Sequence, residues 1–350
     1  MQLPDFFKTL KTHWESKLPF VVYKNPNDYA LSATLQQDTE LVKNLDFSSA
    51  GYVFAPFNTD TNFLVWFPDE NSVKITTRLY PENISPSKTE ITEDSTLKKV
   101  HLSILKKAKQ ELNAENLQKV VISRNESVKI EHIKPFDWLV RMCNLYPNTY
   151  CYCWYHPKVG MWLGATPETL IKLKNKSFST MALAGTMPYI VGENVEWGTK
   201  EIEEQQMVVD YIVRALQPVT ESLKKGSTKT QRAGSLLHLQ TPISGTLTNT
   251  RDLKLIVELL HPTSAVCGLP KEKSKQFILE NENYKREFYT GYLGYFKPDG
   301  HTDLFVNLRC MKVEKNSAKL FIGGGITAAS DLENEWQETV NKSQIMKSIL

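Results

Sequence analysis

Apolar and polar residues alternate along several short runs in the first hundred residues, as in strands that bury one face. Such runs occupy 51–57, 62–68 and 72–80, and they are rich in β-branched and aromatic residues. The following stretch, 81–94, is polar and contains two prolines, which indicates a connecting segment. The N-terminal part is therefore predicted to be rich in strands.

Three later segments are predicted to be helices, two of them from the spacing of their apolar residues. Apolar residues recur every three or four positions from Leu97 to Leu112, which predicts a helix that begins at Asp94 or Ser95. A second helix is predicted over 200–219, ended by Pro218, and a third from about Leu332. Further strands are predicted at 119–130, 149–157, 159–165, 177–186, 291–296, 303–313 and 318–326. Because strands and helices do not alternate regularly, the pattern indicates a mixed, mainly antiparallel α+β fold.

Composition narrows the class of protein. The chain has 350 residues, 41% of them hydrophobic and 23% charged, which indicates a globular protein of one large domain or two ordinary ones. The net charge of +3 without a polybasic run argues against nucleic acid as a partner. No apolar run approaches the ~20 residues of a membrane span, and the N-terminus lacks a signal-peptide pattern. Five cysteines without a CxxC pair favour a reducing, cytoplasmic location.

Two predicted helices each carry a pair of acids three residues apart. Glu201 with Glu204 and Glu335 with Glu338 each share one helix face and could form an edge of an oxygen-ligand site. Such ligands suit Mg²⁺ better than Zn²⁺. The alternative interpretation is an ordinary solvated helix surface.

Lys119 and a glycine run are the other candidates for chemistry. Lys119 lies on the same face as Val121 in an apolar strand, so it either points inward as a base or marks an exposed strand edge. The run Gly323–Gly325 follows a strand without nucleotide-binding spacing and predicts a tight turn or bulge. Cys151 and Cys153 are interpreted as packing residues on one strand face.

Nine motifs together resemble the chorismate-utilising enzymes, which include isochorismate synthases, salicylate synthases and the large component of anthranilate synthase. In order they are QKVVISR, GATPETL, MALAGT, KEIEEQQMVVD, LLHLQTPISG, LLHPTSAVCGLPK, REFYTGYLGY, LFVNLRC and IGGGITAASDLENEWQETVNK. The resemblance implies a single domain over 1–350 with packed antiparallel sheets and outer helices. Within it, 1–95 is expected to be a variable N-terminal part and 96–350 the catalytic part.

The resemblance also implies a ligand and its contacts. The expected ligand is chorismate, bound with Mg²⁺ that Glu204 and Glu338 ligate, with Glu201 and Glu335 close by. Arg309 is expected to clamp a carboxylate with help from Tyr289. Further substrate contacts are expected from Ala184, Gly185, Thr186, His238, Ala265, Gly323, Gly325 and Lys342.

Lys119 indicates the reaction type within this family. The resemblance implies that Lys119 activates water for attack at C2 while Glu168 protonates the departing C4 hydroxyl. Enzymes of the family that use ammonia have glutamine in place of this lysine, so no glutamine amidotransferase subunit is expected. Ala265 in HPTSAVCGLP favours isochorismate as the product. The alternative reaction is salicylate formation by subsequent elimination of pyruvate. A catalytically inactive homologue that only binds a ligand is the alternative outside enzymes. Either menaquinone or siderophore synthesis would use the product.

Overall fold

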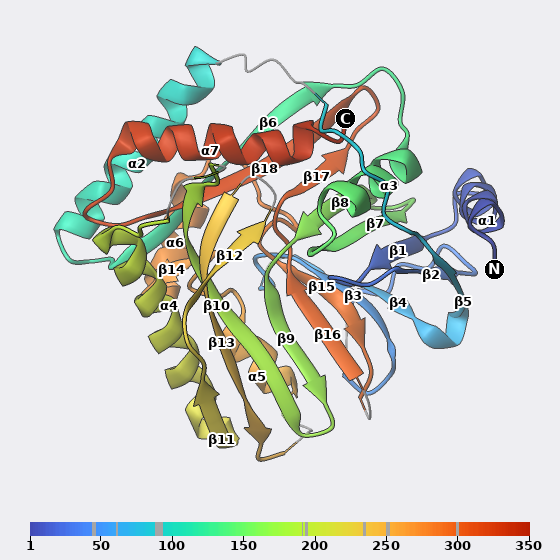
Figure 1. Ribbon diagram of the computed structural model, residues 1–350, viewed down its shortest axis with the longest axis horizontal. Helices are drawn as coiled ribbons and strands as arrows, with labels where there is room; N and C mark the ends of the chain where they lie inside the picture. Colours follow the sequence, from blue (N-terminus) through green and yellow to red (C-terminus); the bar gives the residue numbers. More distant parts are fainter. Residues whose placement is uncertain are drawn as a thin grey trace.

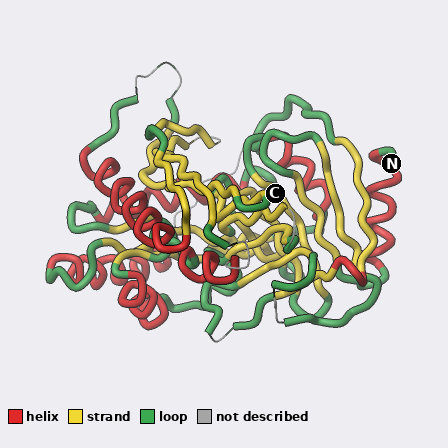
Figure 2. Tube along the Cα trace, turned by 90° about the horizontal axis from the view of Figure 1, so that it is seen from below, coloured by secondary structure: helices red, strands yellow, loops and turns green. Residues whose placement is uncertain are grey.

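The alternating runs form two antiparallel β-sheets that face each other, with helices on their outer surfaces (Figure 1). The computed structural model describes residues 1–43, 47–60, 62–87, 94–190, 192, 195–233, 236–249, 253–298 and 301–350. Viewed from below, the strands lie between groups of helices at the two sides (Figure 2). The predicted α+β architecture with packed antiparallel sheets is confirmed.

The first sheet, sheet A, has the strand order β14-β6-β18-β17-β8-β7-β1-β2-β5. Its strands are β1 (Phe20–Lys24), β2 (Ala30–Gln36), β5 (Ser72–Arg78), β6 (Lys119–Lys129), β7 (Tyr150–His156), β8 (Gly160–Thr166), β14 (Gly268–Leu269), β17 (Cys310–Val313) and β18 (Ser317–Ile326).

The second sheet, sheet B, has the order β11-β13-β10-β9-β16-β15-β3-β4, and β12 pairs with β13. Its strands are β3 (Gly51–Ala55), β4 (Val65–Pro68), β9 (Thr169–Lys174), β10 (Ser177–Pro188), β11 (Thr220–Lys225), β12 (Lys229–Ala233), β13 (Leu236–Leu247), β15 (Tyr292–Phe296) and β16 (His301–Val306). Strands from the first 95 residues belong to both sheets, so no sheet boundary falls at residue 95.

The predicted helices form where their apolar spacing and end signals place them. The side chain of Asp94 accepts hydrogen bonds from the amides of Thr96 and Leu97, which starts α2 at the predicted position. The helix of 200–219 ends at Leu216, just before Pro218, and a short 3₁₀ turn follows (Gln217–Val219). The α-helices of the described residues are α1 (Leu3–Glu15), α2 (Ser95–Asn113), α3 (Pro135–Leu145), α4 (Thr199–Leu216), α5 (Leu253–Leu260), α6 (Lys271–Asn281) and α7 (Leu332–Lys347), and another 3₁₀ turn spans Asp69–Asn71.

Aromatic side chains fill the space between the two sheets. The ring of Phe54 in sheet B lies 4.4 Å from that of Trp154 in sheet A and 4.6 Å from that of Phe288, measured between centroids. Tyr150 stacks on Phe305 across the same interface at 4.1 Å. Large rings bury much apolar area per residue, so this layer is expected to contribute strongly to the free energy of folding.

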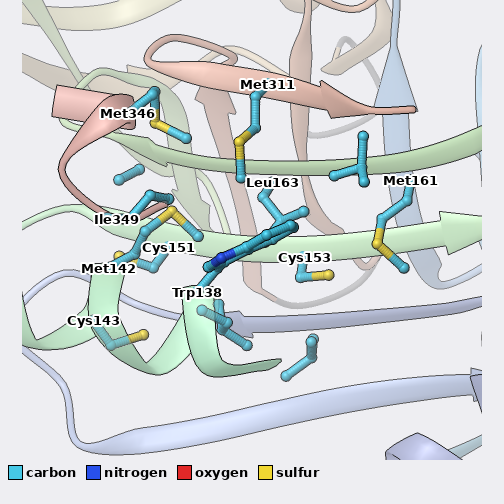
Figure 3. Close-up of a cluster of buried hydrophobic side chains, with 14 of the residues drawn as sticks. Trp138, Met142, Cys143, Cys151, Cys153, Met161, Leu163, Met311, Met346 and Ile349 are labelled. Atoms are coloured by element: carbon cyan, nitrogen blue, oxygen red, sulfur yellow. The ribbon is translucent and has the colours of Figure 1, made fainter. Parts of the chain in front are cut away.

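Helices cover the outer faces of the sheets. Helix α3 and the C-terminal residues pack on sheet A, where Cys151 and Cys153 lie in one buried cluster with Trp138 and Met346 (Figure 3). Helices α4 and α5 cover sheet B, and α2 and α6 cover the β6 end of sheet A. The prediction that Cys151 and Cys153 serve packing is confirmed, and all five cysteines are free and buried. In the described part of the chain, no helix is long and apolar enough to cross a membrane.

Two local predictions are wrong. The run 303–313 forms two strands, β16 and β17, because the backbone of Arg309 has φ of +48° and breaks the extended path. Gly323–Gly325 form no turn; they lie within β18 and pair with Ser123, Ile122 and Val121 of β6.

Candidate active site

Two neighbouring crossovers between the sheets bring Glu168 and Arg309 together. Pro167 and Glu168 connect β8 of sheet A to β9 of sheet B, and residues 307–309 connect β16 back to β17. The amide of Ala165 donates to the Arg309 carbonyl oxygen at 3.1 Å, and that of Val306 donates to the Glu168 carbonyl oxygen at 3.0 Å. These bonds hold the two crossovers side by side, and both side chains line one pocket.

Helices α4 and α7 close this pocket from the other side. In Figure 1, α7 lies across β18 and beside α2, while α4 packs against β10. Fourteen of the predicted site residues line the pocket: Glu168, Ala184, Gly185, Thr186, Glu201, Glu204, His238, Ala265, Tyr289, Arg309, Gly323, Gly325, Glu338 and Lys342. The other two, Lys119 and Glu335, form ion pairs with pocket residues.

Lys119 is completely buried at the start of β6. Its Nζ lies 2.9 Å from Oε1 of Glu204, and its backbone pairs with Leu269 of β14. The interpretation of Lys119 as an exposed edge residue is therefore wrong, because β14 covers that edge and α4 supplies a counter-ion. A buried lysine is tolerated only with such a partner.

Burial has a different consequence for Glu168, whose carboxyl is stabilised in its protonated form. It is buried, and burial raises the pKa of its carboxyl to about 8, although Lys119 and a hydrogen bond from Thr263 Oγ1 at 3.4 Å oppose the rise. A carboxyl with this pKa is mostly protonated near neutral pH and can donate a proton.

Three carboxylates in the pocket are each held by a lysine. Burial raises the pKa of Glu204, but the ion pair with Lys119 and the charges of Lys200 and Lys342 outweigh it, so the net pKa is lowered. Lys342 Nζ lies 2.6 Å from Oε1 of Glu338, one turn away on α7. Each pair gives a partly or fully buried carboxylate a charged hydrogen-bond donor.

Glu335 is the third of these carboxylates. Its Oε1 lies 2.5 Å from Nζ of Lys200, while its Oε2 is buried without a hydrogen-bond partner. Burial and then the neighbouring charge of Glu338 raise the pKa of Glu335, and Lys200 opposes this. The second oxygen of Glu335 is therefore buried beside Gly324.

The glycines of β18 leave room beside these carboxylates. A Cβ atom on Gly325 would lie 2.3 Å from Oε1 of Glu204, and one on Gly324 would lie 3.6 Å from both Oε2 of Glu335 and Oε1 of Glu338. Because Gly324 and Gly325 have no side chains, acids from α4 and α7 can approach this part of β18.

The donor set fits a hard divalent cation. The described residues contain no preformed group of three acidic, histidine or cysteine side chains that would hold a metal. Mg²⁺ needs only one or two protein carboxylates, because it keeps waters and accepts oxygens of its partner ligand. Glu204 and Glu338, with the unpartnered oxygen of Glu335 nearby, meet that requirement.

His238 on β13 orients Arg309. Its Nδ1 lies 3.1 Å from the Gly185 carbonyl oxygen, which can only accept, so Nδ1 carries the proton. Its Nε2 then accepts a hydrogen bond of 2.6 Å from Nη2 of Arg309. Burial, followed by the charge of Arg309, holds the pKa of His238 well below its usual value, so the ring stays neutral.

Backbone strain is concentrated at the same wall. Arg309 and Thr290 both have positive φ, +48° and +60°, which non-glycine residues rarely adopt. Burial lowers the pKa of Arg309 to about 10, so its guanidinium remains charged at neutral pH. Tyr289, next to Thr290, stacks on Phe321 at 5.6 Å between centroids and directs its hydroxyl toward Gly323.

Sequence reasoning did not select Lys200 or Thr263 as site residues. Lys200 directly precedes the acidic pair of α4, so a cation next to predicted metal ligands was the available signal. Thr263 lies two residues before Ala265, but only the fold brings its hydroxyl to Glu168.

Comparisons with known proteins identify the family. Residues 65–350 match the profile of a family described as chorismate binding enzyme. The chain is 33% identical over 213 residues to isochorismate synthase MenF of Escherichia coli (strain K12), a match that covers 58% of this chain and 49% of that protein. The chain therefore aligns with about half the length of this curated relative.

Two solved structures share the fold. One is described as a putative 2,3-dihydroxybenzoate-specific isochorismate synthase, DhbC, from Bacillus anthracis, with a TM-score of 0.80, 23% identity, and coverage of 97% of this chain and 98% of that one. The other is MenF from Escherichia coli, with a TM-score of 0.78, 22% identity, and coverage of 95% and 88%. At these identities the likeness extends to the fold.

The hydrogen bond from Thr263 generates a prediction about the titration of Glu168. Thr263→Val should raise the pKa of Glu168 above about 8, because the lost hydrogen bond stabilises the carboxylate form. Infrared difference spectra of the protonated carboxyl, with Glu168→Gln as the baseline, would follow the titration. Thr263→Ser retains the hydroxyl and should leave the midpoint in place; a midpoint that falls in the valine variant would contradict the assignment.

Proposed function

The chain belongs to the family of chorismate-binding enzymes, and we propose that it converts chorismate into isochorismate with the help of Mg²⁺. The observation that carries the proposal is the combination of Glu168, which lines the pocket, and Lys119, which lies behind the pocket residue Glu204. One is a buried amine and the other a buried carboxyl whose pKa is raised to about 8. A base and an acid in distinct environments are what exchange of a hydroxyl group between two ring carbons requires.

The balance of charge supports a dianionic ligand that arrives with a divalent cation. The site contains four cations and four carboxylates, while Glu168 is mostly neutral. A dicarboxylate and Mg²⁺ together add no net charge, so both can enter without leaving an uncompensated buried charge. The charged groups are Lys119, Lys200, Arg309 and Lys342 on one side and Glu201, Glu204, Glu335 and Glu338 on the other.

Binding is assigned to the arginine wall and the glycine strand. The planar guanidinium of Arg309, oriented by His238, suits a bidentate contact with one carboxylate of the ligand. Lys342 donates to the Gly323 carbonyl oxygen at 3.1 Å as well as to Glu338, and it faces the same space. The bare strand at Gly323–Gly325 leaves room for a flat ring, with Ala184, Gly185 and Thr186 on the β10 side.

In the chemical step the protein accepts one proton from water and donates another to the leaving hydroxyl. To act as the base, Lys119 must first give up the proton that pairs it with Glu204; the free amine then takes a proton from water as the water oxygen bonds to C2 of chorismate. The ring double bond shifts, the C4–O bond breaks, and Glu168 gives its proton to the departing hydroxyl, which leaves as water. The ring gains and loses one hydroxyl group, so the net reaction is an isomerisation.

Metal binding is assigned to Glu204 and Glu338, with Glu201 and Glu335 acting through water or as neighbours. When bound, Mg²⁺ would neutralise the ligand's ring carboxylate in the site.

Isochorismate is favoured over salicylate as the product. The relative with 33% identity is an isochorismate synthase, and the small side chain of Ala265 lines the pocket beside Val266. Lys119 in place of glutamine supports water rather than ammonia as nucleophile, so we propose no glutamine amidotransferase partner. Five free, buried cysteines support a reducing cytoplasmic location.

Turnover of chorismate tests the proposed function directly. Purified protein with chorismate and Mg²⁺ should yield isochorismate, identified by chromatography, and EDTA should stop the reaction until Mg²⁺ is restored. Salicylate as the main product would establish the alternative reaction, and an absence of turnover under all metal conditions would reject the proposal.

Removal of the base and the acid should act on chemistry rather than binding. Lys119→Ala and Glu168→Gln should each lower kcat by about 100-fold or more, in line with the usual contribution of a general base or acid. Chorismate affinity, measured by calorimetry, should change much less, because binding is assigned to Arg309 and the metal. Lys129→Ala, at the exposed far end of β6, is the control. Near-normal turnover in either active-site variant would remove that residue from its role.

Two adjacent glutamates of α4 allow a specific metal ligand to be distinguished from a nearby negative charge. Glu204→Gln should weaken Mg²⁺ binding, measured by calorimetry, by about 10-fold or more, because an amide lacks the charge that Mg²⁺ prefers. Glu203 is exposed, so Glu203→Gln should leave Mg²⁺ affinity unchanged. Equal effects of the two substitutions would contradict the assigned ligand.

A further inference from the structure

Behind the pocket wall lies a buried ion pair that the reaction scheme does not use. Arg286 follows α6, and Glu282 caps its C-terminus; both side chains are 2% exposed. Nε of Arg286 lies 2.8 Å from Oε2 of Glu282, and Nη2 lies 2.6 Å from Oε1, so the pair is bidentate. Such geometry fixes the plane of the guanidinium.

The other donors of Arg286 reach three segments that are distant in sequence. Nη2 donates to the carbonyl oxygen of Val121 at 2.7 Å. Nη1 donates to the carbonyl oxygen of Val266 at 3.0 Å and to Oγ1 of Thr290 at 3.2 Å. One side chain therefore joins β6, the loop after α5 and the turn before β15.

Glu282 strengthens the connection to β6. Its Oε1 accepts hydrogen bonds from both the amide and the hydroxyl of Ser123, each at 2.7 Å. The amide of Val121 in turn donates to the carbonyl oxygen of Cys267 at 2.9 Å, so β6 and the loop are also joined directly. The buried pair organises these links, because its charges are satisfied only when all the partners are in place.

The three segments are walls of the active-site pocket. Val121, Val266 and Thr290 all line it. Val121 lies two residues after Lys119 on the same strand, and the loop that ends at Val266 carries Thr263, whose hydroxyl reaches Glu168.

We propose that Arg286 is a positioning residue for the reaction, which sets the strand of the base Lys119 relative to the loop that contacts the acid Glu168. The inference rests on the proposed function for its kinetic consequence. Arg286 touches neither the ligand space nor the reacting groups, and it acts through the backbone it holds.

The expected signature is a loss of rate without a loss of affinity. The charged groups assigned to binding, Arg309, Lys342 and the metal carboxylates, lie on the second crossover, α4 and α7, which Arg286 does not contact through its hydrogen bonds. Its contact with the assigned binding residue Tyr289 is a looser one, with 5.9 Å between the guanidinium carbon and the ring centroid. Misplacement of reacting groups by about 1 Å can cost about 100-fold in rate. A shift of β6 against the loop should therefore lower kcat and leave KM nearly unchanged.

Arg286→Lys and Arg286→Ala test the proposal, with Arg141→Lys as the matched control. Arg141 also donates to backbone carbonyls of separate segments, those of Ser85 and Ser348, neither of which lines the pocket. Arg286→Lys should lower kcat about 100-fold with KM within about 3-fold, and free guanidinium should partly restore kcat in Arg286→Ala. Arg141→Lys should lower the melting temperature alone. A folded Arg286→Lys enzyme with normal kcat, or one altered only in KM, would overturn the proposal.

Ser123→Ala provides a milder variant in case the arginine variants do not fold. It removes one hydrogen bond to Glu282 and should lower kcat by about 3- to 10-fold at constant KM, as a smaller misplacement would; an unchanged kcat would count against the proposal.

Amide hydrogen exchange separates this proposal from the proposed function. Exchange over 119–123 and 263–267 should accelerate in Arg286→Lys, or in Ser123→Ala, but not in Arg141→Lys, whether or not chorismate is turned over. Unchanged exchange would reject Arg286 as the organiser of these walls, while absence of turnover in the wild-type protein would reject only the reaction.

Discussion

The site depends on the place where the chain twice passes from one sheet to the other. The crossovers after β8 and after β16 lie side by side because backbone hydrogen bonds join Ala165 to Arg309 and Val306 to Glu168. In addition, Thr166 Oγ1 donates to the carbonyl oxygen of Val306 at 2.6 Å. Backbone groups that leave a sheet can no longer form hydrogen bonds with a neighbouring strand, so here they bond to the other crossover. This pairing fixes where the Glu168 carboxyl and the Arg309 guanidinium enter the pocket.

The buried charges obey a second constraint that links function to stability. Each ionised group in the pocket is expensive to bury alone, so the helices α4 and α7 must deliver acids to the lysines of β6 and of their own surfaces. Glu168 satisfies the constraint differently, by keeping its proton. The pocket therefore brings ion-paired carboxylates and one largely protonated carboxyl together.

Periodicity predicted the elements, whereas contacts between elements decided the details. The start of α2 at Asp94 and the end of α4 before Pro218 could be predicted, because local side chains set them. The break between β16 and β17 could not, since nothing in the alternating run 303–313 signals a positive φ at Arg309. The strand conformation of Gly323–Gly325 depends on pairing with β6. The family was predicted from sequence and is confirmed by the match over residues 65–350, and Lys119 and the acidic pairs were predicted as site residues. The role proposed for Arg286 depends on segments that meet only in space.

The cancellation of charge in the pocket also governs how ligands arrive. A site whose positive and negative groups balance projects little field into solvent, so long-range steering of an anion toward it is weak and association is expected to depend little on ionic strength. Inside the pocket the opposite holds: a dianion alone or a divalent cation alone would leave charge uncompensated. If the proposed dianion and Mg²⁺ are the ligands, we expect them to bind with positive cooperativity, each raising the affinity for the other by the same factor.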